Sequence, residues 1–169
     1  VDETGQDTEG ALFLVSVVVT GQERRRLQHA LAQIEQATKK GARKWRRSSF
    51  ANRLNYLRAV FSNPLFHKNI FFAQYAQTKA YFDLTAYSTA RAILKKAEGN
   101  YKATVLVDGL EETELRRFGK ELRKLQVRVE KVRGLREGSD ALIRLADAIA
   151  GFVRDAQEGQ SYARQLYQE

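Results

Sequence analysis

Hydrophobic residues along this chain follow two spacings, one typical of β-strands and the other typical of helices. Apolar, β-branched or alternating segments predict strands near residues 1–3, 11–20, 69–75, 103–107 and 127–132. Apolar residues at helical spacing predict helices near residues 23–38, 49–62, 79–98, 113–125 and 140–156. Ser48 or Ser49 is the expected N-cap of the second helix, and Ser139 is the expected N-cap of the last.

The order of these elements predicts the fold class. The first two strands lie close enough in sequence to form a hairpin, and the later strands alternate with helices. Alternating strands and helices are typical of an α/β fold, in which helices cover a mixed sheet. We therefore expect residues 1–169 to form a single α/β domain.

Composition excludes several classes of site. The chain has 169 residues, enough to bury its own core, with no cysteine and two histidines. Disulfides, thiolate zinc sites, iron–sulfur clusters and cysteine nucleophiles are therefore excluded. The longest apolar run, Ala11–Val19, contains Ser16 and is too short to cross a membrane, and no secretory signal is recognisable. We expect a cytoplasmic protein without membrane contact.

Positive charge is concentrated in one segment. Residues 24–58 hold eleven basic side chains and one acid, Glu35, so this segment carries +10 while the whole chain carries +9. Such a block predicts a polyanionic partner, DNA or RNA ahead of an anionic membrane surface, although a solvated face that aids solubility has the same composition. The candidate contacts are Lys44, Trp45, Arg46 and Arg47, where Trp45 either stacks on bases or covers the junction of two helices.

Three acids stand at positions where solvated surface acids are uncommon. Asp2 ends the first strand, Asp108 directly follows the apolar segment Thr104–Val107, and Asp147 lies among small and apolar residues of the last long helix. In open α/β sheets, ligands bind outside the carboxyl ends of the strands. If the strands of Asp2 and Asp108 are parallel neighbours, both carboxylates lie on one edge, and Asp147 reaches that edge from the helix.

Converging carboxylates need a cation to remain ionised together. With no cysteine and little histidine, an all-oxygen site favours Mg²⁺ or Mn²⁺. Each acid also has a purely structural interpretation: Asp2 and Asp108 suit turns, and Asp147 could pair with Arg144 or Arg154. We therefore treat Asp2, Asp108 and Asp147 as the candidate metal ligands and catalytic residues.

Three further acids are weaker candidates. Glu3 points to the opposite strand face from Asp2, so only one of the two belongs to the site. Asp140 shares a helical face with Asp147 but suits the first turn of a helix. Glu137 is a loop acid that could add a ligand.

Two motifs resemble a known family. The opening Val1–Gly5 and the helix segment Leu142–Gly151 resemble the bacterial family called "domain of unknown function 3800", which typically opens with Asp-Glu-Ser-Gly and closes with a helix reading Leu-Gln-Leu-Ala-Asp. Thr4 stands where the family usually has Ser, and Arg144 where it usually has Gln. The motifs lie near the two ends, so the resemblance spans most of the chain.

That family is similar to the ribonuclease H-like superfamily, and the resemblance has consequences for fold and site. It implies a three-layer fold with a mixed five-stranded sheet, helices on both faces and a basic helical insertion at residues 22–62. It also implies that Asp2 is the first-strand ligand, Asp108 the fourth-strand ligand and Asp147 the last-helix ligand of a metal-dependent nuclease.

Three functions from different classes follow. The first is a Mg²⁺- or Mn²⁺-dependent nuclease that hydrolyses phosphodiester bonds in DNA or RNA. The second is a non-catalytic nucleic-acid-binding module on the same fold. The third is a protein-interaction domain that docks through the basic segment, with Trp45 and Phe50 as anchors.

Overall fold

The computed structural model of the protein describes residues 1–135 and 140–168. The strands in this part are β1 (Asp2–Thr4), β2 (Phe13–Val18), β3 (Ile70–Tyr75), β4 (Ala103–Asp108) and β5 (Val129–Leu135). The α-helices are α1 (Arg24–Ala37), α2 (Phe50–Phe61), α3 (Tyr81–Lys96), α4 (Glu112–Lys124), α5 (Ala141–Gln157) and α6 (Ser161–Gln168). The predicted α/β class and the order of elements are confirmed, and the polar tail adds α6.

The strands form two sheets, so the single five-stranded sheet expected from the sequence is not confirmed. β1, β2 and β3 form an antiparallel sheet in that order, and β4 pairs with β5 in parallel. Among the described residues, two backbone hydrogen bonds join the sheets: the Val1 nitrogen donates to the Leu106 oxygen at 2.8 Å, and the Asp108 nitrogen donates to the Val1 oxygen at 3.3 Å. β1 is too short to continue the ladder along β4.

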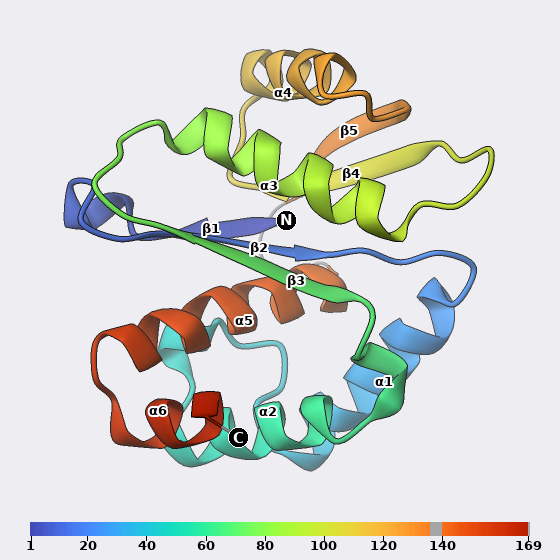
Figure 1. Ribbon diagram of the computed structural model, residues 1–169. Coiled ribbons are helices and arrows are strands. Elements are labelled where there is room, and N and C mark those ends of the chain that lie inside the picture. Colours follow the sequence, from blue (N-terminus) through green and yellow to red (C-terminus); the bar gives the residue numbers. More distant parts are fainter. Residues whose placement is uncertain (136–139, 169) are drawn as a thin grey trace.

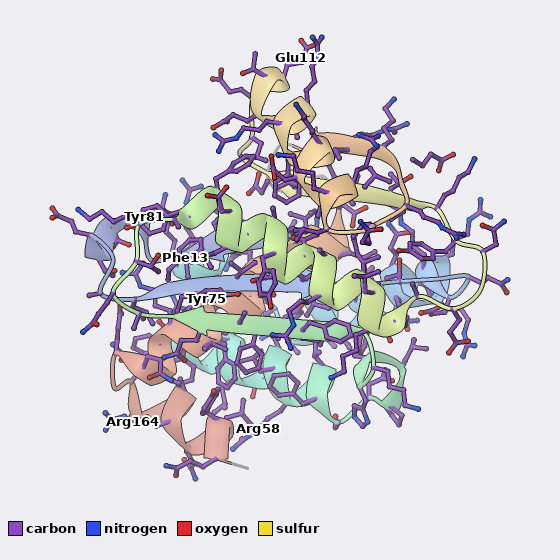
Figure 2. All side chains as sticks on the ribbon, turned by 45° about the horizontal axis from the view of Figure 1, so that its top comes forward. Phe13, Arg58, Tyr75, Tyr81, Glu112 and Arg164 are labelled. Carbon is purple, nitrogen blue, oxygen red and sulfur yellow. The ribbon has the colours of Figure 1, made fainter. Side chains whose placement is uncertain are left out.

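Helices cover both sides of the strands (Figure 1). α3 and α4 lie on one side, where Phe13, Val15 and Val107 contribute to a core with Phe118. α1, α2, α5 and α6 lie on the other side, and their core holds Leu14. Successive residues of β2 therefore serve opposite cores, as expected for a strand buried on both faces. Figure 2 shows Phe13, Tyr75 and Tyr81 gathered between the antiparallel sheet and α3.

Capping side chains fix the helices that carry the candidate site. Ser49 caps α2 by accepting a hydrogen bond from the Asn52 nitrogen at 3.3 Å, as one of the two sequence alternatives predicted. Asp140 caps α5 by accepting from the Leu142 nitrogen at 2.7 Å. Ser139, the predicted cap of this helix, and the weaker candidate Glu137 lie outside the described residues.

Candidate functional site

The junction of the two sheets brings Asp2 beside Asp108. The bonds from Val1 to Leu106 and Asp108 have the pattern of parallel neighbours, and Asp2 and Asp108 directly follow the joined positions. Asp108 ends β4 as expected, but Asp2 begins β1, so the prediction that Asp2 ends its strand is wrong. The parallel pairing through Val1 nevertheless brings these two acids, far apart in the chain, level with each other on adjacent strands.

Strand register shows which side of the sheets these acids face. Asp2 lies opposite Ser16 in the β1–β2 pairing, and Ser16 alternates with Val15 and Val17, which pack toward α3. Asp108 likewise follows Val107, which packs toward α3 and α4. Since side chains alternate along a strand, Asp2, Ser16 and Asp108 face α5. Glu3 lies opposite Val15 and faces the other way, as predicted.

Asp147 approaches from α5, which packs against β1 and β2. Its Oδ2 atom accepts a hydrogen bond of 2.8 Å from the backbone nitrogen of Trp45. Gly151, one turn further along α5, makes room for the Trp45 ring: a Cβ atom there would lie 2.1 Å from Trp45 Cδ1. The small residue thus lets the basic segment pack closely against the helix that carries Asp147.

Mutual repulsion and burial perturb these carboxylates. Burial, reinforced by the negative charges of Asp147, Glu3 and Asp108, raises the pKa of Asp2 to about 8. Burial also raises the pKa of Asp147, against the hydrogen bond from Trp45 and the positive charges of Lys40 and Lys44. Asp2, Asp108 and Asp147 therefore lie within electrostatic reach of one another.

Glu3 is a separate buried acid on the opposite face. Its Oε2 atom is buried without a hydrogen-bond partner in the described structure. Burial, with Asp108 and Glu114 as neighbouring acids, raises the pKa of Glu3 to about 7. The strand thus places two protonatable carboxyls next to each other in sequence but on opposite faces.

The donor chemistry fits a divalent cation, but the ligands are not gathered into a complete shell. Burial and the neighbouring acids raise the pKa of Asp2; a bound cation would offset these negative charges, and oxygen donors are those that Mg²⁺ and Mn²⁺ prefer. Within residues 1–135 and 140–168, however, no three His, Cys, Asp or Glu side chains are close enough to hold one ion. Any common ion would require these side chains to move together.

The two arginines considered as partners of Asp147 are engaged elsewhere. Arg144 donates from Nε and Nη2 to the two carboxylate oxygens of Glu35, each at 2.7 Å. Arg154 donates to both oxygens of Asp7, at 2.9 and 2.8 Å. Asp140 accepts from Arg24 and Gln28 in addition to capping α5, which gives it the structural role that its position favoured.

The buried cluster behind Asp147 has no counterpart in the sequence-based expectations. Glu35 is 5 % exposed and Lys40 is fully buried; Lys40 Nζ lies 3.9 Å from Glu35 Oε1 and donates to the Arg43 oxygen. With Arg144 this cluster ties α1 and the basic segment to α5. Glu35 is the only acid in a segment of eleven cations, and that isolation was the signal that it is buried and paired.

Ser16 is a second feature whose position became clear only from strand pairing. Its hydroxyl is fully buried, has no hydrogen-bond partner in the described structure, and lies opposite Asp2 in the register. In the sequence it is the one polar residue inside an apolar run. That interruption marked a buried polar position within the core.

The basic segment is only partly a solvent-exposed surface. Lys40 and Arg53 are buried, and Arg53 donates to Asp155 at 2.9 Å. Arg46 and Arg47 are exposed, while Lys44 is half-buried. The other exposed cations of the segment are Arg24, Arg25, Arg26, Lys39, Arg43 and Arg58.

Trp45 lies in the core and not on the surface. It is 4 % exposed, its ring nitrogen donates to Asp155 Oδ2 at 2.8 Å, and the Arg53 guanidinium lies 5.0 Å from its ring centre. No ring face is open for base stacking in this arrangement. The alternative interpretation, a ring that covers the junction of the two helices of the basic segment, is only partly met, because the ring contacts Arg53 of α2 and Asp155 of α5.

Strands covered by helices on both sides define this chain as an α/β protein. A chain of the PCNA:RNase HII complex from Archaeoglobus fulgidus is similar in structure, with a TM-score of 0.51 over 99 % of this chain and 84 % of that chain. The two sequences are 14 % identical, so the likeness shows the fold alone.

Sequence comparisons add no family. No family model and no curated protein matches the chain. The resemblance to the "domain of unknown function 3800" family is therefore unconfirmed, and the ribonuclease H-like part of it rests on the structural likeness. Among the described residues, no helix combines the length and apolar character needed to cross a membrane.

Proposed function

We propose that the protein is a divalent-metal-dependent nuclease that hydrolyses phosphodiester bonds in DNA or RNA. The observation that carries this proposal is the juxtaposition of Asp2, Asp108 and Asp147, three acids from distant parts of the chain, on one side of a ribonuclease H-like fold. Burying carboxyl groups whose negative charge is not fully balanced lowers the stability of the folded state. Proteins retain such unfavourable groups mainly at active sites.

In this proposal Asp2, Asp108 and Asp147 hold one or two Mg²⁺ or Mn²⁺ ions. When bound, the metal supplies an activated water and stabilises the charge that develops on the phosphodiester. The hydrogen bond from the Trp45 backbone to Asp147 orients this carboxylate. Lys40 and Lys44 balance part of its negative charge before a metal arrives.

The nucleic-acid backbone would be held by the basic segment. Lys44, Arg46 and Arg47 flank Trp45, whose backbone contacts Asp147, so cations lie next to the proposed reaction centre. Trp45 serves as the anchor of this segment and the three cations as its phosphate contacts. Residues 22–62 then form a basic helical insertion within one ribonuclease H-like domain spanning residues 1–169.

The test is cleavage of labelled single-stranded and double-stranded DNA and RNA with Mg²⁺ or Mn²⁺. Asp108→Asn keeps the shape of the side chain and removes its charge, so we expect it to abolish metal-dependent cleavage while the protein stays folded. Asp83 is an exposed acid on α3 that faces Arg117 of α4, so Asp83→Asn is the matched control and should cleave normally. Cleavage by Asp108→Asn at the wild-type rate would refute the proposal.

A non-catalytic nucleic-acid-binding module is the second candidate, favoured by one observation. In the described part of the chain the carboxylates do not form a ready-made metal shell. This candidate predicts salt-sensitive binding to nucleic acid without any metal requirement. If the wild-type protein binds nucleic acid but does not cleave it with either Mg²⁺ or Mn²⁺, the non-catalytic module is favoured.

A further inference from the structure

The outer strand β3 has an unprotected edge. It is the last strand of the antiparallel sheet, and within the described residues no strand pairs with its far side. Its sequence, Ile-Phe-Phe-Ala-Gln-Tyr, has no charge and no proline. By contrast β5, the outer strand at the other end, carries Glu130, Lys131 and Arg133. Edge strands normally carry such charges because a bare edge pairs with other chains.

A groove runs along this edge between β3 and α3. The groove has a volume of about 540 Å³ and reaches inward to Val15 and Val17 of β2.

 A smaller cavity of about 300 Å³ lies on the opposite face of the sheet, between β3 and α5. The larger groove exists because α3 packs mainly over β2, and because Ala73, between Phe71 and Tyr75 on this face, is too small to fill the space.

Positive charge lines one wall of the larger groove. Arg91 and Lys95 are exposed, stand one helical turn apart on α3, and line the groove, and no acid lines it in the described structure. Lys95 Nζ lies 5.8 Å from the centre of the Phe71 ring. The hydroxyl groups of Tyr75 and Ser88 form a hydrogen bond of 2.8 Å, which joins β3 to α3.

We infer that this groove binds an extended segment of a partner protein in which apolar residues alternate with Asp or Glu. The segment adds to the open edge of β3 as a further strand, so that its backbone completes the hydrogen bonds of the sheet. Its apolar side chains fill the space above Ala73, and its carboxylates face Arg91 and Lys95.

Charge argues against a second copy of this chain as the occupant. Two-fold pairing of β3 with β3 would bring the Arg91 and Lys95 side chains of two chains, each with a net charge of +9, toward one another. The apolar floor of the groove, formed by Val15, Val17 and Phe71, suits a protein side chain better than a phosphate backbone.

The experiment is a selection of short random peptides displayed on phage against the whole chain, followed by affinity measurement with the selected peptides. We expect enrichment of alternating apolar and acidic residues, and changes in the amide NMR signals of β3 and α3 on binding. The double variant Arg91→Glu/Lys95→Glu should weaken binding by at least about tenfold. Replacing the peptide acids by Lys should restore binding to that variant.

Two controls separate this result from a general charge or folding effect. Lys102→Glu/Lys120→Glu makes the same change in net charge at exposed positions outside the groove and should leave the affinity unchanged. Ala73→Trp fills the groove without changing charge and should abolish binding in a protein whose circular dichroism spectrum is unchanged. Selected peptides that bind Arg91→Glu/Lys95→Glu as tightly as wild type would overturn the inference, as would a dimer joined through β3 or displacement of the peptide by nucleic acid.

Discussion

At the scale of single residues, the carboxyl of Asp2 couples folding to pH. Burial and the neighbouring acids raise its pKa from 3.8 to about 8. The folded state therefore holds this proton more tightly than the unfolded chain does. The stability that the protonated group contributes is complete below about pH 4 and is lost as the pH rises toward about 8. Glu3, whose pKa is raised to about 7, acts in the same direction.

This coupling predicts how Asp2→Asn behaves. The amide keeps the shape of the neutral acid, so the variant should unfold at about the wild-type temperature near pH 4 and at a higher temperature near pH 8. Thermal unfolding followed by circular dichroism across this range measures the difference, and Asp83→Asn serves as the exposed control. A difference between Asp2→Asn and wild type that stays constant with pH would contradict the assignment.

Gly151 shows how a single missing side chain sets the distance between two parts of the site. A Cβ atom at this position would overlap the Trp45 ring, 2.1 Å from Cδ1. Gly151→Ala should therefore lower the free energy of unfolding by about 2 kcal/mol, the range typical of overpacking. The cost should shrink in a Trp45→Ala background, as measured by urea denaturation; equal costs in both backgrounds would exclude this contact as the cause.

At the scale of elements, buried ion pairs attach the basic segment to α5. Arg144 on α5 meets Glu35 on α1 through two hydrogen bonds of 2.7 Å, and Lys40 lies beside the same carboxylate. Arg53 on α2 meets Asp155 on α5. Helical segments separated by about a hundred residues are thus joined by charges that cannot return to water without unfolding.

Removing one partner of the central pair should be costly. Arg144→Ala removes the closest cation from the buried Glu35 and leaves Lys40 as its ion-pair partner among the described residues, so we expect a loss of about 3 kcal/mol in the free energy of unfolding. Arg154→Ala, on the same helix but bonded to the exposed Asp7, should cost less than about 1 kcal/mol. Urea denaturation compares them, and equal losses would show that the Arg144 pair is no more important than a surface pair.

The element order was predictable because each segment shows its own periodicity. The apolar run that becomes β2 and the stripes that bury Leu27, Leu31, Phe118 and Leu122 could be identified without knowledge of their partners. The candidates Asp108 and Asp147 could be selected for a related reason, since each interrupts an apolar context, whereas Asp2 was selected because it was expected to end a strand. The rule for the carboxyl ends of strands applies to Asp108 at the end of β4, but Asp2 begins β1 and Asp147 lies on α5, so their positions near Asp108 required the structure.

Pairing across the molecule could not be read from local sequence. Nothing near Trp45 indicates that its backbone meets Asp147 or that its ring nitrogen meets Asp155. The division into two sheets depends on how far β1 extends along β4, which the short segment Asp2–Thr4 does not specify. Long-range contacts of this kind decide which cations are buried and which remain free to bind a partner.

At the scale of the whole molecule, exposed positive charge lies next to the proposed centre. Because Lys40 and Arg53 are buried, fewer than the eleven cations of the segment are available to a nucleic acid under the proposed function. Arg46→Ala/Arg47→Ala should reduce the slope of log affinity against log salt by about 2, since each phosphate contact contributes close to one. Lys102→Ala/Lys120→Ala is the matched control, measured by fluorescence anisotropy at several salt concentrations. An unchanged slope would remove Arg46 and Arg47 from the interface.

The measurement that tests the central claim most directly is a crystal structure of the protein soaked in Mn²⁺, with the ion located by its anomalous scattering. The account predicts a peak with oxygens of Asp2, Asp108 and Asp147 at about 2.1 Å from it, the distance typical of such ions. Carboxylates that stay apart at saturating Mn²⁺, with no peak between them, would contradict it.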